Sequence, residues 1–89
     1  MKESYNQLLA KKAIEIIRED FNPEHIFSVR EIVNHNLIPW ANNRLTIMRI
    51  IKSGALKAKI TQGDTPKNNR YDMKMENIIS YLKKYSNLK

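Results

Sequence analysis

Residues 44–53 combine cationic and apolar side chains at helical spacing. One face of this helix holds Ile47, Ile50 and Ile51, which we expect to be buried. Its outward positions hold two arginines, a lysine and two flexible apolar side chains: Arg44, Arg49, Lys52, Leu45 and Met48. Arginine donates paired hydrogen bonds to guanine or phosphate, and an apolar side chain contacts the thymine methyl group. The helix is therefore predicted to bind nucleic acid. The alternative is an ordinary amphipathic helix that faces solvent.

A second basic group follows in a predicted hairpin. Leu56, Ala58 and Ile60 alternate with Lys57 and Lys59, as in a half-buried strand. Turn-forming residues between positions 62 and 69 predict a polar loop, and residues 70–73 predict the return strand. The cations of this hairpin are Lys57, Lys59, Lys67 and Arg70. We predict that they contact an adjacent phosphate or the minor groove, although lysine on an edge strand also protects against aggregation.

The net charge of +7 is concentrated in the later part of the chain. Residues 1–25 carry four basic and five acidic side chains, whereas residues 26–89 carry twelve basic and four acidic ones. A small basic domain commonly binds a polyanion, and the helix and the hairpin favour double-stranded DNA as that partner. Lysine-rich chains also stay soluble through their charge, but solubility does not require the charge to be segregated.

Local capping signals predict where the helices that position these cations begin and end. Ser28 and Glu31 form a capping box, which predicts a short helix over residues 29–35. Asn43 is the predicted cap of the helix over residues 44–53, and Gly54 ends that helix. Two further apolar stripes predict helices over residues 4–21 and 75–85.

The segment between the second and third helices is predicted to form a corner. Pro39 prevents the second helix from continuing. Leu37, Ile38 and Trp40 are expected to fill the inside of this corner. The order of elements then predicts a mostly α fold with a small β-hairpin (α+β), which is a winged helix-turn-helix with an extra N-terminal helix.

At 89 residues the chain is predicted to be a single domain. Within it, residues 1–25 form a supporting or dimerisation helix, and residues 26–54 form the helix-turn-helix. Residues 55–73 form the wing hairpin, and residues 74–89 form the closing helix. A homodimer through residues 4–21 remains open beside a purely supporting role for this helix.

The composition argues against an enzyme, a metal site and a membrane protein. The chain has no cysteine, and His25 and His35 therefore lack the usual partners of a zinc site. With only Gly54 and Gly63, it cannot build a glycine-rich phosphate loop. We expect no catalytic residue, no cofactor and no metal. The apolar runs are too short to span a bilayer, so we expect a cytoplasmic protein, associated with the nucleoid when bound to DNA.

Three ordered stretches match the landmarks of a known family. They are FSVREIV at residues 27–33, RLTIMRIIKSGAL at residues 44–56, and RYDMK at residues 70–74 followed by Ile78 and Leu82. Over residues 27–82 the chain resembles the excisionase/MerR-like winged-helix DNA-binding module. It departs from that module in two ways: the corner at residues 36–43 is longer than usual and contains Trp40, and the first helix is additional.

The resemblance implies sequence-specific binding of double-stranded DNA. Small proteins of this kind act in transcription regulation or in DNA recombination, as excision factors of mobile elements or phages beside a recombinase or another DNA-bound protein. The base-reading residues that it implies are Arg44, Leu45, Thr46, Met48 and Arg49; the wing contacts are Lys57, Lys59, Lys67 and Arg70. An alternative of another class is a winged-helix adaptor that docks a partner protein on Leu45 and Met48.

Overall fold

Four helices and a three-stranded antiparallel sheet form the part of the chain that the computed structural model describes, residues 5–65 and 69–86. The helices are α1 (Tyr5–Asp20), α2 (Val29–Asn34), α3 (Arg44–Lys52) and α4 (Met75–Ser86). The strands are β1 (Ile26–Ser28), β2 (Lys59–Thr61) and β3 (Arg70–Lys74). This mixed α/β content agrees with the class predicted from the sequence.

The capping residues of α2 and α3 do what their sequence signals predict. The backbone N–H of Glu31 donates to Ser28 Oγ at 3.2 Å, and the backbone N–H of Ser28 donates to Glu31 Oε1 at 3.3 Å. Asn43 Oδ1 accepts a 2.9 Å hydrogen bond from the backbone N–H of Thr46. Gly54 follows α3 with a φ of 85°, a left-handed conformation that favours glycine. These bonds satisfy backbone donors that a helix start otherwise leaves unpaired.

The corner between α2 and α3 is filled and tied to α4. Leu37 and Ile38 are buried at 1% and 0% exposure, as predicted. Trp40 is half-buried, and its Nε1–H donates a 2.7 Å hydrogen bond to the hydroxyl of Tyr81 on α4. This bond joins residues 41 positions apart, so the long corner has a fixed place on the domain.

The sheet contains a strand that the sequence pattern does not reveal. Strand β1 pairs with β3, with Phe27 opposite Met73, and β3 lies between β1 and β2. Phe27 is fully buried here, in a segment for which the sequence predicts no strand. Three residues are too few to display an alternating pattern, and the partner strand is more than 40 residues away along the chain.

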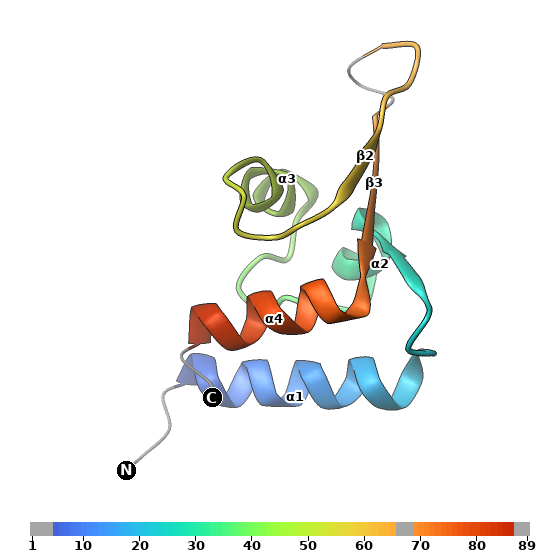
Figure 1. Cartoon of the computed structure of the whole chain (residues 1–89). Coiled ribbons are helices and arrows are strands. Elements are labelled where there is room, and N and C mark those ends of the chain that lie inside the picture. Colours follow the sequence, from blue (N-terminus) through green and yellow to red (C-terminus); the bar gives the residue numbers. More distant parts are fainter. Residues whose placement is uncertain (1–4, 66–68, 87–89) are drawn as a thin grey trace.

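Strand β2 is shorter than predicted and lies later in the chain. Leu56 is buried at 1% exposure, but Ile60 is 51% exposed, so the alternation expected over residues 55–60 does not continue. Residues 55–58 cross from α3 to the sheet before the strand begins (Figure 1). Ile60 pairs with Tyr71 where the hairpin leaves the body of the domain, and the core no longer covers it there.

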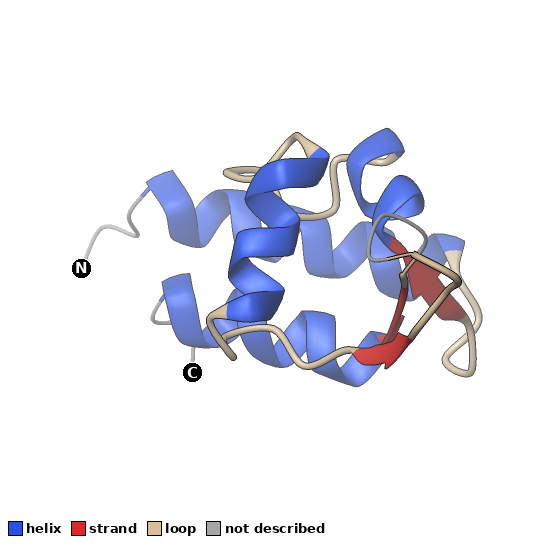
Figure 2. Cartoon of the chain, turned by 90° about the horizontal axis from the view of Figure 1, so that it is seen from above, coloured by secondary structure: helices blue, strands red, loops and turns tan. Residues whose placement is uncertain are grey.

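Helices α1 and α4 form a layer on one side of the molecule. They pack antiparallel, and α1 contributes the buried residues Ala10, Ala13, Ile14 and Ile17 (Figure 1). Helix α3 and the β2–β3 hairpin lie on the other side of α4, and α3 runs across the α1/α4 layer (Figure 2). The inner face of α1 is therefore packed within the domain, and its role as a supporting or dimerisation helix stays a prediction.

None of the helices in the described residues combines the length and the apolar character that crossing a membrane requires.

Candidate functional site

The outer surface of α3 carries a stripe of three residues. Leu45, Arg49 and Lys52 are spaced at i, i+4 and i+7, so they share one face of the helix. All three are exposed, and Leu45 is 69% exposed. Ile47 and Ile51 anchor the opposite face in the core, at 0% and 7% exposure. The apolar face thus fixes the rotation of α3 and presents this stripe outward.

Met48 and Ile50 depart from the inside and outside pattern predicted for α3. Met48 was expected to face outward, and Ile50 was expected to be buried. Both are half-buried and pack against the edge of the core. They flank Ile47 and Ile51 on either side of the helix, so each has one side covered and one side open.

Thr46 has a structural task at the start of α3. Its hydroxyl donates to Asn43 Oδ1 at 3.0 Å, and its backbone N–H donates to the same oxygen. The side chain is half-buried. Thr46 was expected to read bases, but its hydroxyl hydrogen is already bonded within the helix cap.

The hairpin presents its own cations beside α3. Lys57, Lys59 and Arg70 are exposed, whereas Lys67 lies outside the described residues. Arg70 Nε donates to Asp72 Oδ1 at 3.2 Å, and the Arg70 side chain is 76% exposed. Lys59 is the register partner of Asp72, which places both on the same face of the sheet. One carboxylate therefore partly offsets two of the hairpin cations.

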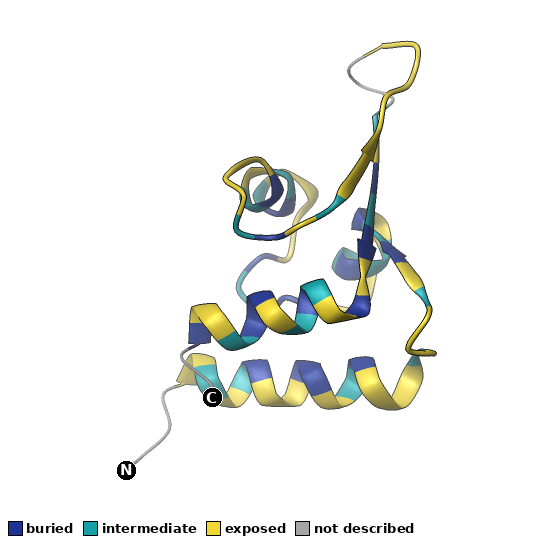
Figure 3. Ribbon diagram, viewed as in Figure 1, coloured by how far each residue is buried: buried dark blue, intermediate teal, exposed yellow. Residues whose placement is uncertain are grey.

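Helix α3 and the hairpin together form a surface that is poor in acidic groups. The chain contains no aspartate or glutamate between Ile32 and Gly63. Within the described part of the chain, none of the cations of this segment is held in an ion pair; they are Arg44, Arg49, Lys52, Lys57 and Lys59. The outer side of α3 and the hairpin is exposed (Figure 3). Unpaired cations on one side of a domain attract a polyanion.

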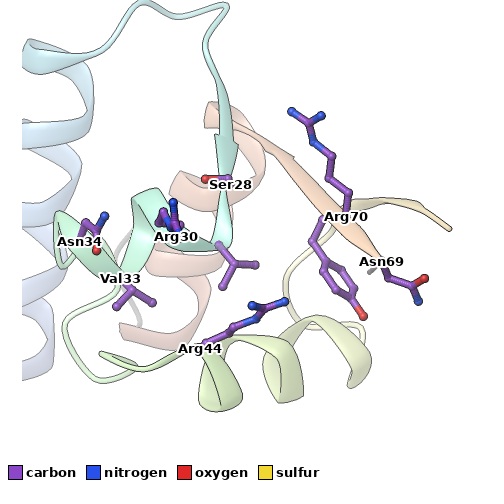
Figure 4. Close-up of a pocket in the computed structure, with 9 residues that line it drawn as sticks. Ser28, Arg30, Val33, Asn34, Arg44, Asn69 and Arg70 are labelled. Carbon is purple, nitrogen blue, oxygen red and sulfur yellow. The ribbon is translucent and has the colours of Figure 1, made fainter. Parts of the chain in front are cut away.

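A cavity of about 420 Å³ adjoins this surface between α2, the start of α3 and β3 (Figure 4). Arg30 on α2 and Arg44 on α3 both line it. Arg30 was not among the residues predicted from the sequence, because its place in the lining of the same cavity as Arg44 depends on how α2 and α3 pack. A helical wheel of the six-residue α2 places Arg30 on its exposed side, which was the available signal.

The two histidines each make other contacts. His25 Nε2 lies 2.7 Å from Glu31 Oε2, and His35 is the C-cap of α2 with its ring edge against Phe21. Among the residues that the structure describes, no group of three or more His, Cys, Asp or Glu side chains is placed to hold a metal ion. His25 is half-buried, because it packs against Phe21 and Phe27.

The carboxylate of Glu31 is stabilised in its charged form. Burial raises the pKa of Glu31, but hydrogen bonds from His25 and Ser28 outweigh burial, and the pKa is lower than its ordinary value. Glu31 therefore serves the start of α2, where its acceptor oxygens hold the capping box and His25 together.

Comparisons with protein-family models, with curated proteins and with solved structures found no match to this chain.

Proposed function

We propose that this protein binds double-stranded DNA as a winged helix-turn-helix. Helix α2, the corner and α3 form the helix-turn-helix, and the β2–β3 hairpin forms the wing. Helix α3 enters the major groove, and the wing lies on the adjacent backbone or minor groove. The observation that carries the proposal is the exposed stripe of Leu45, Arg49 and Lys52 on α3. This helix lies on the same side of α4 as the basic hairpin and belongs to a stretch, residues 33–62, without acidic side chains.

The dimensions and chemistry of α3 support this arrangement. An α-helix with its side chains is roughly 10–12 Å across, close to the ~12 Å width of the major groove. Arg49 lies in the middle of the exposed stripe and is the strongest candidate for a base contact. Leu45, also exposed, is suited to a thymine methyl group. Lys57, Lys59 and Arg70 are candidates for phosphate contacts, and the same role for Lys67 stays a prediction.

Titration of the affinity for a duplex against salt tests the proposal. If about five to eight basic groups neutralise phosphates, log affinity should fall against log salt with a slope of roughly −4 to −7. Arg49→Gln should reduce the preference among duplex sequences, while Lys59→Gln should weaken binding to all sequences about equally. Arg18→Gln is the matched control, because Arg18 is exposed on α1, on the other side of the molecule. A slope near zero for the unaltered protein would exclude DNA binding of this kind.

Two biological roles fit the proposed activity. An excision factor of a mobile element or phage would bind beside a recombinase, and a transcriptional regulator would bind at a promoter. Footprinting with the recombinase attachment site and with the neighbouring promoter distinguishes the two roles. A homodimer through residues 4–21 remains a prediction. The outer face of α1 that is left for it carries charged residues, including Lys12, Glu15, Arg18 and Glu19.

No observation favours the adaptor alternative over DNA binding. It requires Leu45 and Met48 to form one apolar contact patch, but Met48 packs partly against the core. Leu45 alone leaves a single exposed apolar side chain on the described surface of α3, at one end of the stripe, and isolated apolar side chains are common on protein surfaces.

A further inference from the structure

The cavity between α2, α3 and β3 has the lining of an anion site. Arg30 and Arg44 supply its cations, and Asn34 and Asn69 supply amide groups. None of the side chains that line it is acidic. Guanidinium groups bind phosphate oxygens through paired hydrogen bonds, and the amides add further donors.

Arg44 faces a different direction from the outer stripe of α3. It precedes Ile47 by three residues and Ile51 by seven, so it lies on the inward face of the helix. The first turn of α3 extends past the edge of the core, so Arg44 is exposed although Ile47 and Ile51 on the same face are buried. Figure 4 shows the Arg44 side chain extending from the start of α3 toward the space between α2 and β3. Arg44 therefore belongs with the cavity and not with Arg49.

Arg70 also lines the cavity but is committed elsewhere. Its side chain extends from β3 away from α3, and its Nε is bonded to Asp72 (Figure 4). The cationic groups available inside the cavity are therefore those of Arg30 and Arg44.

Apart from Ser28, the remaining wall of the cavity is apolar. Val29 and Tyr71, at 8% and 7% exposure, line it together with the half-buried Val33. A bare ion makes no use of such a wall, whereas a sugar packs its carbon atoms on it. The volume of about 420 Å³ lies within the range of roughly 300–1,000 Å³ found for small-ligand pockets.

We propose that this cavity binds a nucleotide phosphate, with Arg30 and Arg44 on the phosphate oxygens and the sugar against Val29 and Tyr71. The phosphate comes from a strand of bound DNA, in which case the inference rests on the proposed function, or from a free mononucleotide. In the first case Arg44 fixes the position of the backbone and does not read a base.

The test compares Arg30→Gln, Arg44→Gln and the double variant with Arg18→Gln as control. All three arginines are exposed, so folding should be unchanged, and thermal melts verify this. For a duplex of mixed sequence, each cavity variant should bind about tenfold more weakly at fixed salt. The double variant should lose less than the product of the single losses, because both arginines hold one phosphate. For the double variant, the slope of log affinity against log salt should become less negative by about 0.9, because one phosphate contact is lost.

A second measurement uses free ligands. Thymidine monophosphate should shift the NMR signals of the Val29, Val33 and Tyr71 side chains, which line the cavity in every variant, and thymidine, which lacks the phosphate, should not. Shifts in wild type that vanish in the double variant, without any duplex binding, would refute the proposed function but identify a free nucleotide as the ligand. Weaker duplex binding without monophosphate shifts would identify the DNA backbone.

Other outcomes overturn the inference. If wild type and the double variant bind duplex with the same affinity and slope, and monophosphate shifts do not depend on the two arginines, the cavity is not a phosphate site although DNA binding stands. Single losses that multiply in the double variant would mean that the arginines act on separate phosphates. If neither ligand binds, both proposals fail.

Discussion

Trp40→Phe should destabilise the domain by about 2 kcal/mol, because Trp40 ties the corner to α4. About 1 kcal/mol comes from the lost hydrogen bond to Tyr81, which is 2.7 Å long. About 1 kcal/mol more comes from the smaller apolar area that phenylalanine covers at this half-buried position. For a domain of this size each kcal/mol lowers the melting temperature by roughly 4–8 °C, so the expected shift is roughly 8–16 °C.

A double-mutant cycle isolates the hydrogen bond from the change in ring size. Urea denaturation of Trp40→Phe, Tyr81→Phe and the double variant should give a coupling energy of about 1 kcal/mol. Tyr85→Phe is the matched control. The Tyr85 ring centroid lies 4.6 Å from that of Tyr81, so the variant removes a neighbouring hydroxyl, but Trp40 donates its hydrogen bond to Tyr81 and not to Tyr85. Trp40→Phe and Tyr85→Phe should be additive. A coupling between Trp40 and Tyr81 below about 0.3 kcal/mol would refute the role given to this bond.

Three further perturbations test the elements around the site. Gly54→Ala should lower the free energy of unfolding in urea by about 1 kcal/mol. No atom lies within 4 Å of an added Cβ, so only the φ of 85° opposes the alanine. Gly54→Asn should lower it less, and equal losses would argue against backbone strain. Asn43→Ala should also cost about 1 kcal/mol and speed amide exchange at Thr46, whereas unchanged exchange would contradict the cap. The lowered pKa of Glu31 means that its ionised form stabilises the fold, so this contribution is present above about pH 4.5 and is lost as the pH falls through the lower folded value. The stability advantage of wild type over Glu31→Gln should therefore shrink on acidification, and a constant difference would show that Glu31 does not titrate in this way.

Features encoded by neighbouring residues were predictable from the sequence. Asn43 and Gly54 bound α3 correctly because a helix cap is formed by groups a few residues apart. The capping box at Ser28 and Glu31 has the same local origin. Strand β1 was missed because its pairing with β3 is a distant contact without a local signal.

The candidate site divides in the same way. The exposed stripe at Leu45 and Arg49 follows from helical spacing alone. The inward direction of Arg44 also follows from its spacing to Ile47. Arg44 was nevertheless predicted to face outward, because in the first turn an inward side chain can still be exposed. That Arg30 and Arg44 line one cavity could not be predicted, because it depends on the packing of α2 on α3, which no local pattern encodes.

Two strand-to-helix junctions join α2 and α4 directly to the sheet. Strand β1 ends at Ser28 and α2 begins at the next residue; β3 ends at Lys74 and α4 begins at Met75. Since β1 and β3 are paired, the sheet and these two helices form one frame. Helix α3 is joined to that frame by loops at both ends, residues 35–43 and 53–58. Its position relative to the hairpin is therefore set by side chains, namely the bond from Trp40 to Tyr81 and the packing of Ile47 and Ile51, and not by a direct backbone junction.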